Sequence, residues 1–440
     1  MQKEEKRKAK VYLPLASRGH PCNGDQFVWK IFLIALGLRL GFVLFYPQFP
    51  LGYDALMYDE LGWNLAKGKG FIGGFTGSTI GSPDGPEVGV GPIYPAFLAL
   101  IYLTFKHHLI AVRIVQAFLS AAVILVLYPK VREAFGSDTG KLSSVLIALY
   151  PAFIIYPGIL LTDTLFLFFL AILIWALISA VQSDSPWRWV IAGAVMGGTI
   201  LLRQETLVMV PVFAGLVLWQ FPREGLIRKL SLFLLVSVLS VGIWTVRNYL
   251  VFDELILVSA HGGDTLWIST KGWTEWHDED PDFQSLVQGL NYIKRNNVLR
   301  KEGIINIARD PLNYLLLCIK RLPHLWITSH TTYLAGLTNT YQQSYMHGAF
   351  GKLFAKIVLL GGNLALIFMG IWGAFIALKA QKEKLGLIFF FLVPIVVIAI
   401  IHFFLFAAPR YQVPIMPFVL VFAGTQLNRL YLMMLPLLRR

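Results

Sequence analysis

Long apolar segments recur along the whole chain, separated by short clusters of lysine and arginine. Of the 440 residues, 56% are hydrophobic and 14% are charged. Soluble domains are about 45–50% apolar and about 25% charged. A membrane-spanning helix needs roughly 17–25 mostly apolar residues. The sequence therefore predicts an all-α polytopic membrane protein with about ten transmembrane helices, at residues 29–48, 109–129, 142–159, 162–181, 189–203, 206–221, 230–250, 354–378, 386–406 and 411–432.

The basic clusters predict the orientation of these helices, because lysine and arginine are enriched in cytoplasmic loops. The clusters are Lys3, Lys6, Arg7, Lys8 and Lys10; Lys130, Arg132 and Lys141; Arg188; Arg223, Arg228 and Lys229; Lys379, Lys382 and Lys384; and Arg439 and Arg440. All of them lie on one side of the membrane if both termini are cytoplasmic. Orientation thus accounts for the net charge of +13, and we expect no nucleic-acid partner. We expect a multi-pass protein of the inner (plasma) membrane whose active site faces the periplasm or exterior.

Four regions follow from this topology. Residues 1–28 form a cytoplasmic N-terminal segment, and the first apolar run lacks a cleavage site, so we expect it to be retained as a span. Residues 29–250 form the N-terminal transmembrane catalytic module, whose outer loop, 49–108, ends in the interfacial helix "PIYPAFLALIYLTF". Residues 251–353 form an outer (periplasmic) loop, and residues 354–440 supply the C-terminal transmembrane helices. Within 251–353, the run "IARDPLNYLLLCIKRLPHLWITSH" is predicted as a second interfacial or re-entrant helix, since a span there would put "KAQKEK" outside.

Ionisable residues collect at the predicted outer ends of the spans, where they are functional candidates. They are two acids, Asp54 and Asp163, and a basic set, Arg203, Arg247 and Arg410 with the adjacent Tyr411. The span that ends at Arg203 measures only about 22 Å at 1.5 Å per residue, so this arginine is expected below the outer surface. Acids and arginines at one depth in the membrane suit a site in which the arginines bind a buried anionic group and a neighbouring acid accepts a proton.

The stretch "GYDALMYDELGWNLAKGKGF" holds three acids that helical geometry separates. A helix over 55–67 makes Asp54 its N-cap and places Tyr58 on the same face as Asp54. Asp59 and Glu60 are rotated away and are predicted to be solvated. The sequence thus favours Asp54 as the candidate base.

Simpler roles remain open for these candidates. Asp54 and Asp163 could each only cap a helix, and Arg203 could pair locally with Glu205 or reach the interface, as could Arg247. The histidines are scattered without metal-ligand spacing, so no metal site is predicted. The two acids leave a divalent cation possible, and no other cofactor is indicated. Cys22 and Cys318 are far apart, which argues against a disulfide.

Several motifs together resemble a known superfamily. They are "YDALMYDELGWNLAKGKGF", "GPIYPAFLALIYLTF", "YPGILLTDTLFLFFL", "LLRQETL", "IWTVRNYLVF" and "APRYQVPIMP", in that order. This order is similar to that of the GT-C glycosyltransferases, most of all the branch with the protein O-mannosyltransferases and the lipid A aminoarabinose transferases. The short polar portion argues against an oligosaccharyltransferase. The lipid A enzymes carry an acid-Lys-Pro-Pro-Leu-Tyr run where this chain has "EVGVGPIYP", so Glu87 is displaced from the family pattern.

The resemblance implies a helical membrane bundle whose first outer loop covers a catalytic cavity, and a polyprenyl-phosphate sugar as donor lipid. It implies that Asp54 and Asp163 are the catalytic acids and that Arg203, Arg247, Arg410 and Tyr411 face the lipid phosphate. Tyr58 and Glu87 become substrate-binding candidates. The acceptor is a lipid, glycan or protein, and transfer is expected to invert the sugar. The alternatives are a polysaccharide polymerase or ligase that uses pyrophosphate-linked glycans, a secondary transporter, and a membrane scaffold.

Overall fold

A computed structural model describes residues 23–46, 51–73, 85–221, 224–272, 280–331 and 341–438. Within these ranges the chain is helical, and its only β-type pairing is an isolated bridge between Ile72 and Pro86. Cys22, Arg223 and the basic residues predicted at the two termini lie outside the described residues.

Each of the ten predicted spans corresponds to one helix or to a pair of helices. They are α2 (Asn23–Phe45), α6 (Leu109–Phe135), α7 (Ser137–Leu149) with α8 (Pro151–Ile155), α9 (Thr162–Val181), α10 (Pro186–Leu202), α11 (Met209–Gln220), α12 (Leu226–Phe252), α18 (Phe350–Ala380), α19 (Leu385–Phe404) and α20 (Met416–Leu438). Seven described helices are long and apolar enough to cross a membrane, or eight if the α7–α8 pair, bent by 56°, counts as one. The helices α10 and α11 have the predicted positions but are shorter than a full span.

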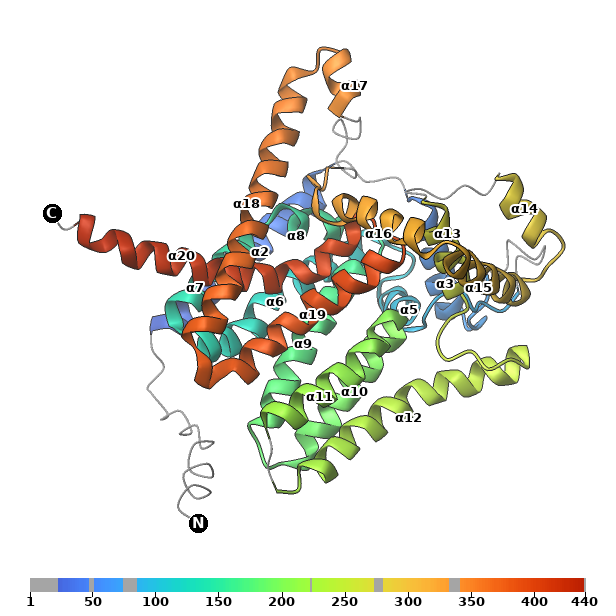
Figure 1. The fold of residues 1–440 in the computed structure, drawn as a ribbon, viewed down its shortest axis with the longest axis horizontal. Coiled ribbons are helices and arrows are strands. Elements are labelled where there is room, and N and C mark those ends of the chain that lie inside the picture. The colour runs from blue at the N-terminus through green and yellow to red at the C-terminus, as the bar shows by residue number, and fades with distance from the viewer. Residues whose placement is uncertain are drawn as a thin grey trace.

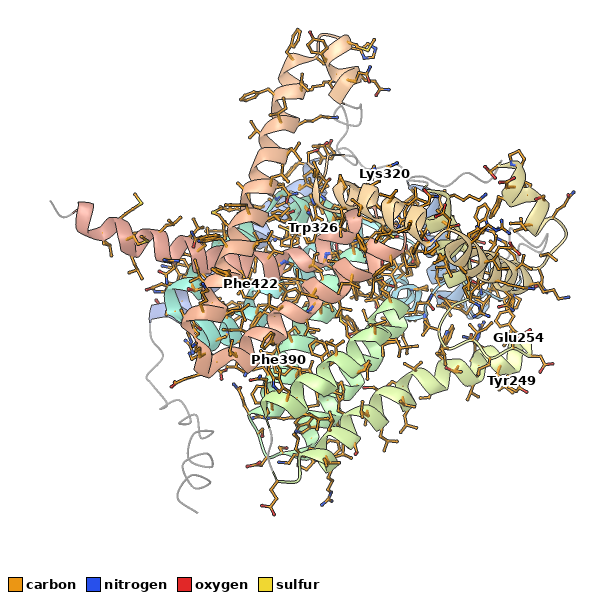
Figure 2. The ribbon with its side chains drawn as sticks, in the orientation of Figure 1. Tyr249, Glu254, Lys320, Trp326, Phe390 and Phe422 are labelled. Carbon is orange, nitrogen blue, oxygen red and sulfur yellow. The ribbon has the colours of Figure 1, made fainter. Side chains whose placement is uncertain are left out.

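Close contacts between small residues hold the bundle together. Helices packed in lipid gain little from hydrophobicity and rely on backbones that approach closely. A Cβ on Gly373 of α18 would lie 1.9 Å from the carbonyl oxygen of Phe422 on α20, and one on Gly193 of α10 would lie 2.6 Å from that of Phe233 on α12. Figure 2 shows Phe422 and Phe390 among the densely packed side chains of this bundle.

A buried arginine stabilises the break between α7 and α8. Pro151 begins α8, so the last carbonyls of α7 have no continuing helix to bond. Arg39 of α2 is fully buried and donates to the carbonyl oxygens of Ile147 (3.0 Å) and Ala148 (3.1 Å). Its Nε also donates to the Ser120 hydroxyl at 2.9 Å. Arg39 therefore satisfies backbone groups that lipid cannot solvate.

The two outer loops form helices that, except for α17 beside α18, gather on one side of the molecule (Figure 1). The first contains α3 (Tyr53–Ala66) and α5 (Ile93–Phe105), which is the short apolar helix predicted there. The second contains α13 (Gly262–Lys271), α14 (Pro281–Val287), α15 (Tyr292–Arg309), α16 (Pro311–Trp326) and α17 (Tyr341–Met346). Short 3-10 turns link consecutive helices of the bundle: η2 (Tyr156–Gly158) joins α8 to α9, η3 (Gln204–Val208) joins α10 to α11, and η5 (Pro409–Ile415) joins α19 to α20.

Candidate active site

An acid of the first outer loop meets an arginine that lies 356 residues later in the chain. Asp54 Oδ2 accepts a hydrogen bond from Arg410 Nη1 at 2.5 Å. Asp54 lies in the first turn of α3, and the N-cap residue is Gly52, so the prediction that Asp54 is the N-cap was wrong. The helix begins two residues earlier than the capping pattern indicated. The Asp54 carboxylate is thereby paired with a side chain of η5 and remains 37% exposed.

A second acid–arginine pair is more deeply buried. Asp163, in the first turn of α9, is 1% exposed and accepts a hydrogen bond from Arg203 Nη2 at 2.8 Å. Arg203 follows the last residue of α10, as predicted, and also donates to the Thr162 hydroxyl from Nε at 3.0 Å. Glu205 is farther from Arg203, at 4.0 Å, so the local pair is the weaker contact. Asp163 Oδ2 is buried and has no hydrogen-bond partner among the described residues.

The ring of Tyr411 lies beside both arginines. The Cζ atoms of Arg203 and Arg410 are 5.7 Å and 5.2 Å from its centroid. The ring of His402 also stacks on Tyr411, with the ring centroids 4.0 Å apart. Aromatic faces attract cations, so Tyr411 stabilises two guanidinium groups that would otherwise repel each other.

Tyr58 belongs to the same charged cluster. Burial and then the charge of Asp54 raise the pKa of Tyr58, while Arg410 and Arg203 lower it. Its ring packs edge-on against Tyr94 of α5 at 4.9 Å. The structure therefore brings together six of the eight residues predicted for the site: Asp54, Tyr58, Asp163, Arg203, Arg410 and Tyr411.

The other two predicted residues, Arg247 and Glu87, form a separate group. Arg247 Nη1 donates to the carbonyl oxygen of Glu87 at 3.0 Å, and Nη2 to that of Phe71 at 3.4 Å. Its Cζ lies over the Trp244 ring at 4.8 Å. The Glu87 side chain is fully buried, and its carboxylate accepts from the amide of Val88 at 3.0 Å. Both residues thus tie the first outer loop to α12.

Asp59 is less solvated than its helical position suggested. It accepts a hydrogen bond from Tyr102 at 2.5 Å and contacts His107 Nε2 at 2.8 Å, and its side chain is 13% exposed. Both partners come from the α5 region, which sequence spacing within α3 cannot reveal. Glu60 is exposed, as predicted.

A buried polar network behind Tyr411 escaped the sequence analysis. Gln412 Nε2 donates to the Trp326 carbonyl at 3.3 Å, so Gln412 Oε1 accepts from Asn363 at 3.1 Å and faces His330 Nε2 at 2.7 Å. Because Oε1 cannot donate, His330 carries its hydrogen on Nε2. Tyr150 completes the network by donating to Asn363 Oδ1 at 2.8 Å. Four segments therefore fix the η5 turn that holds Arg410.

The neutral His330 predicts a specific acid sensitivity. Burial lowers its pKa from 6.5 to about 4, so between these values the unfolded chain binds a proton that the folded chain does not. Folding stability should therefore fall as the pH decreases through this interval. We expect the melting temperature of His330→Gln to depend less on pH there than that of the wild type. The matched control is His108→Gln, which changes an exposed histidine; equal pH dependence in wild type and His330→Gln would contradict the assignment.

No group of three His, Cys, Asp or Glu side chains in the described ranges is arranged to hold a metal ion. Both carboxylates of the candidate site are instead paired with arginines. The arrangement thus offers one half-exposed carboxylate, Asp54, beside the partly exposed guanidinium of Arg410, which is 28% exposed. Such a pair can accept a proton and bind an anion at neighbouring positions.

Comparisons with known proteins agree with this architecture. Residues 86–246 match the family model described as dolichyl-phosphate-mannose-protein mannosyltransferase. A search of curated protein sequences finds no match. Among solved structures, the apo oligosaccharyltransferase of Archaeoglobus fulgidus matches 94% of this chain with a TM-score of 0.58 at 15% identity.

Two further structures are similar over most of the chain. The oligosaccharyltransferase AglB of Archaeoglobus fulgidus, in complex with an inhibitory peptide and a dolichol-phosphate, has a TM-score of 0.57 at 15% identity and 93% coverage of this chain. ArnT from Cupriavidus metallidurans bound to undecaprenyl phosphate has a TM-score of 0.43 at 11% identity, with 92% of this chain and 77% of that chain covered. The chain spans about half the length of the archaeal structures, 51% and 50% respectively. The family-model match and the two archaeal structures confirm the predicted resemblance, and the chain is a multi-pass membrane protein with the GT-C glycosyltransferase fold.

Proposed function

We propose that this protein transfers a sugar from a polyprenyl-phosphate donor to an acceptor on the outer face of the membrane. The observation that carries the proposal is the contact between Asp54 of the first outer loop and Arg410 of the η5 turn. The family match and the dolichol-phosphate bound to the AglB structure support a donor of this class. The acceptor is a lipid, glycan or protein, and the predicted orientation, with cytoplasmic termini, places the site at the periplasm or exterior.

Asp54 suits the role of base. Arg410 holds Oδ2, while Oδ1 makes no hydrogen bond to any described residue and can receive a proton. The acceptor oxygen attacks the anomeric carbon, and the bond from that carbon to the donor phosphate breaks. The electron pair leaves with the phosphate, and the acceptor proton goes to Asp54. Attack opposite the leaving group inverts the anomeric configuration.

The departing phosphate needs cations, since it leaves with an additional negative charge. Arg410 is the more accessible of the two clustered arginines, at 28% exposure against 9% for Arg203. We therefore assign direct phosphate contact to Arg410. Arg203 adds a second positive charge, and Asp163 acts as the positioning residue that fixes it. Arg247 keeps a supporting role through the first outer loop.

Replacing Arg410 with lysine tests the phosphate assignment. Lysine keeps the charge but loses the planar fork, so one charge-assisted hydrogen bond to the phosphate or to Asp54 is lost. We expect the KM for a polyprenyl-phosphate sugar to rise roughly tenfold to a hundredfold. The matched control is Arg300→Lys, on the exposed side of α15.

The same assay separates the alternative functions. Turnover only with pyrophosphate-linked glycans would favour a polymerase or ligase. Uptake into proteoliposomes without sugar transfer would favour a transporter. An unchanged donor KM in Arg410→Lys would overturn the phosphate role of Arg410 while leaving the transferase activity standing.

A further inference from the structure

Helix α16 buries a charged side chain and exposes large apolar ones. Its protein-facing side includes Arg321, which is 4% exposed, together with the buried Cys318 and Leu325. The outward side carries large aliphatic residues: Leu312 (75% exposed), Leu315 (45%), Leu316 (55%), Ile319 (50%) and Leu322 (37%). At 100° per residue these five form one stripe, which we call the α16 stripe, opposite Arg321.

Such a distribution is the reverse of that on a water-exposed helix. A surface helix in water directs its apolar stripe to the core and its charges to solvent. In α16 an arginine lies on the buried side, and five leucine or isoleucine side chains point outward. No described part of the chain buries these five side chains, which are 37% to 75% exposed. The α16 stripe therefore fits an apolar environment.

The position of α16 relative to the bundle identifies that environment. Arg321 Nη1 donates to the carbonyl oxygens of Phe403 (3.0 Å) and Phe404 (3.2 Å), in the last turn of the candidate span α19. The Tyr314 hydroxyl also donates to the Phe404 carbonyl. Helix α16 thus lies across the end of a membrane-spanning helix, at the level where hydrocarbon meets water.

The charge of α16 matches an anionic lipid surface. The helix has no acidic residue between Pro311 and Trp326, and Lys320 supplies its outward positive charge because Arg321 is buried. Lys320 is exposed, and Figure 2 shows it on the outer side of α16. It follows Ile319 by one residue, about 100° around the helix, so it stands at the margin of the stripe. A lysine there can rest its stem on acyl chains and reach the headgroup phosphates.

We propose that α16 lies flat in the outer lipid–water interface, with the α16 stripe among acyl chains and Lys320 at anionic headgroups. The sequence left an interfacial and a re-entrant helix open for this segment, and the proposed placement is the interfacial one. The lipid contact fixes the second outer loop against the end of α19, and through it the turn that carries Arg410. This placement of α16 does not depend on whether the protein transfers sugars.

A fluorescence measurement on the full-length protein tests this placement. Cys22→Ser and Cys318→Ala remove the native thiols, and a bimane probe is attached to Leu316→Cys or, as control, to Arg300→Cys on α15. The proteins are placed in nanodiscs of phosphatidylcholine and phosphatidylglycerol, and each labelled form must keep the melting temperature of its unlabelled parent. We expect nitroxide-labelled lipids to quench the probe at 316 severalfold more than the probe at 300, and aqueous iodide to do the opposite.

Two outcomes would overturn the proposal. Equal iodide quenching at 316 and 300 would place the α16 stripe in water. Protection of 316 from both iodide and nitroxide lipid would mean that protein covers the stripe. For the charge, we expect Lys320→Gln to remove any blue shift at 316 that depends on phosphatidylglycerol. An undiminished shift would exclude Lys320 as the headgroup contact.

Discussion

Replacing Asp54 with asparagine is expected to lower sugar transfer by about 10²–10⁴-fold, the usual contribution of a positioned general base. Asparagine has nearly the same shape but cannot take the acceptor proton. Asp54 is 37% exposed at the edge of the first outer loop, so its loss should leave the fold intact. The measurement is the initial rate of transfer from a polyprenyl-phosphate sugar, with donor KM and kcat determined separately.

Two variants keep this experiment specific. Glu254→Gln removes an exposed carboxylate just after α12 and should transfer sugar at the wild-type rate. Asp54→Glu retains a carboxylate on a longer side chain and should recover part of the activity. Near-normal kcat in Asp54→Asn would show that Asp54 holds Arg410 but does not act as the base.

Replacing Arg39 with methionine is expected to produce the largest loss of stability. Methionine has a similar length but leaves the carbonyl oxygens of Ile147 and Ala148 and the Ser120 hydroxyl without this donor. Each buried polar group left unpaired costs about 1–3 kcal/mol. Removing the buried guanidinium also removes its desolvation cost, which offsets part of this loss. We expect a net destabilisation of a few kcal/mol, seen as a marked fall in melting temperature and in the yield of folded protein.

The number of donors, not charge alone, should determine the effect at this position. Arg39→Lys keeps the charge but can supply fewer directed hydrogen bonds, so its melting temperature should lie between those of Arg39→Met and the wild type. The matched control, Arg188→Met, removes an arginine that donates one hydrogen bond to a described backbone carbonyl, that of Ser179 at 3.1 Å. A wild-type melting temperature in Arg39→Met would mean that the α7–α8 break is stable without this donor.

The spans, and the places of the candidate site residues near helix ends, were predictable because they depend on local chemistry. Length and apolar content determine whether a helix crosses the bilayer, and these are properties of a single segment. An arginine at the end of a short apolar run, such as Arg203, is likewise visible in sequence. The order of the motifs matched that of the GT-C glycosyltransferases, and this resemblance led to the expectation that Asp54 and Arg410 belong to one site.

What the sequence could not reveal depends on contacts between distant segments. Arg39 lies in the first span, and two of its acceptors are carbonyl oxygens of α7 more than a hundred residues away, so its role is not visible in the local sequence. Asp59 seemed solvated because Tyr102 and His107 come from the following helix and loop. His330 joins a network whose members span four segments. Arg247 matched the family pattern, yet its guanidinium meets backbone carbonyls of the first outer loop.

The most direct test of the proposed activity follows the donor itself. Purified protein in lipid nanodiscs is incubated with a polyprenyl-phosphate sugar labelled at the anomeric carbon, and the products are analysed by NMR and mass spectrometry. We expect release of the free polyprenyl phosphate together with a transferred sugar of inverted anomeric configuration, both reduced at least about a hundredfold in Asp54→Asn. A retained configuration, or cleavage of pyrophosphate-linked donors alone, would contradict the proposed function.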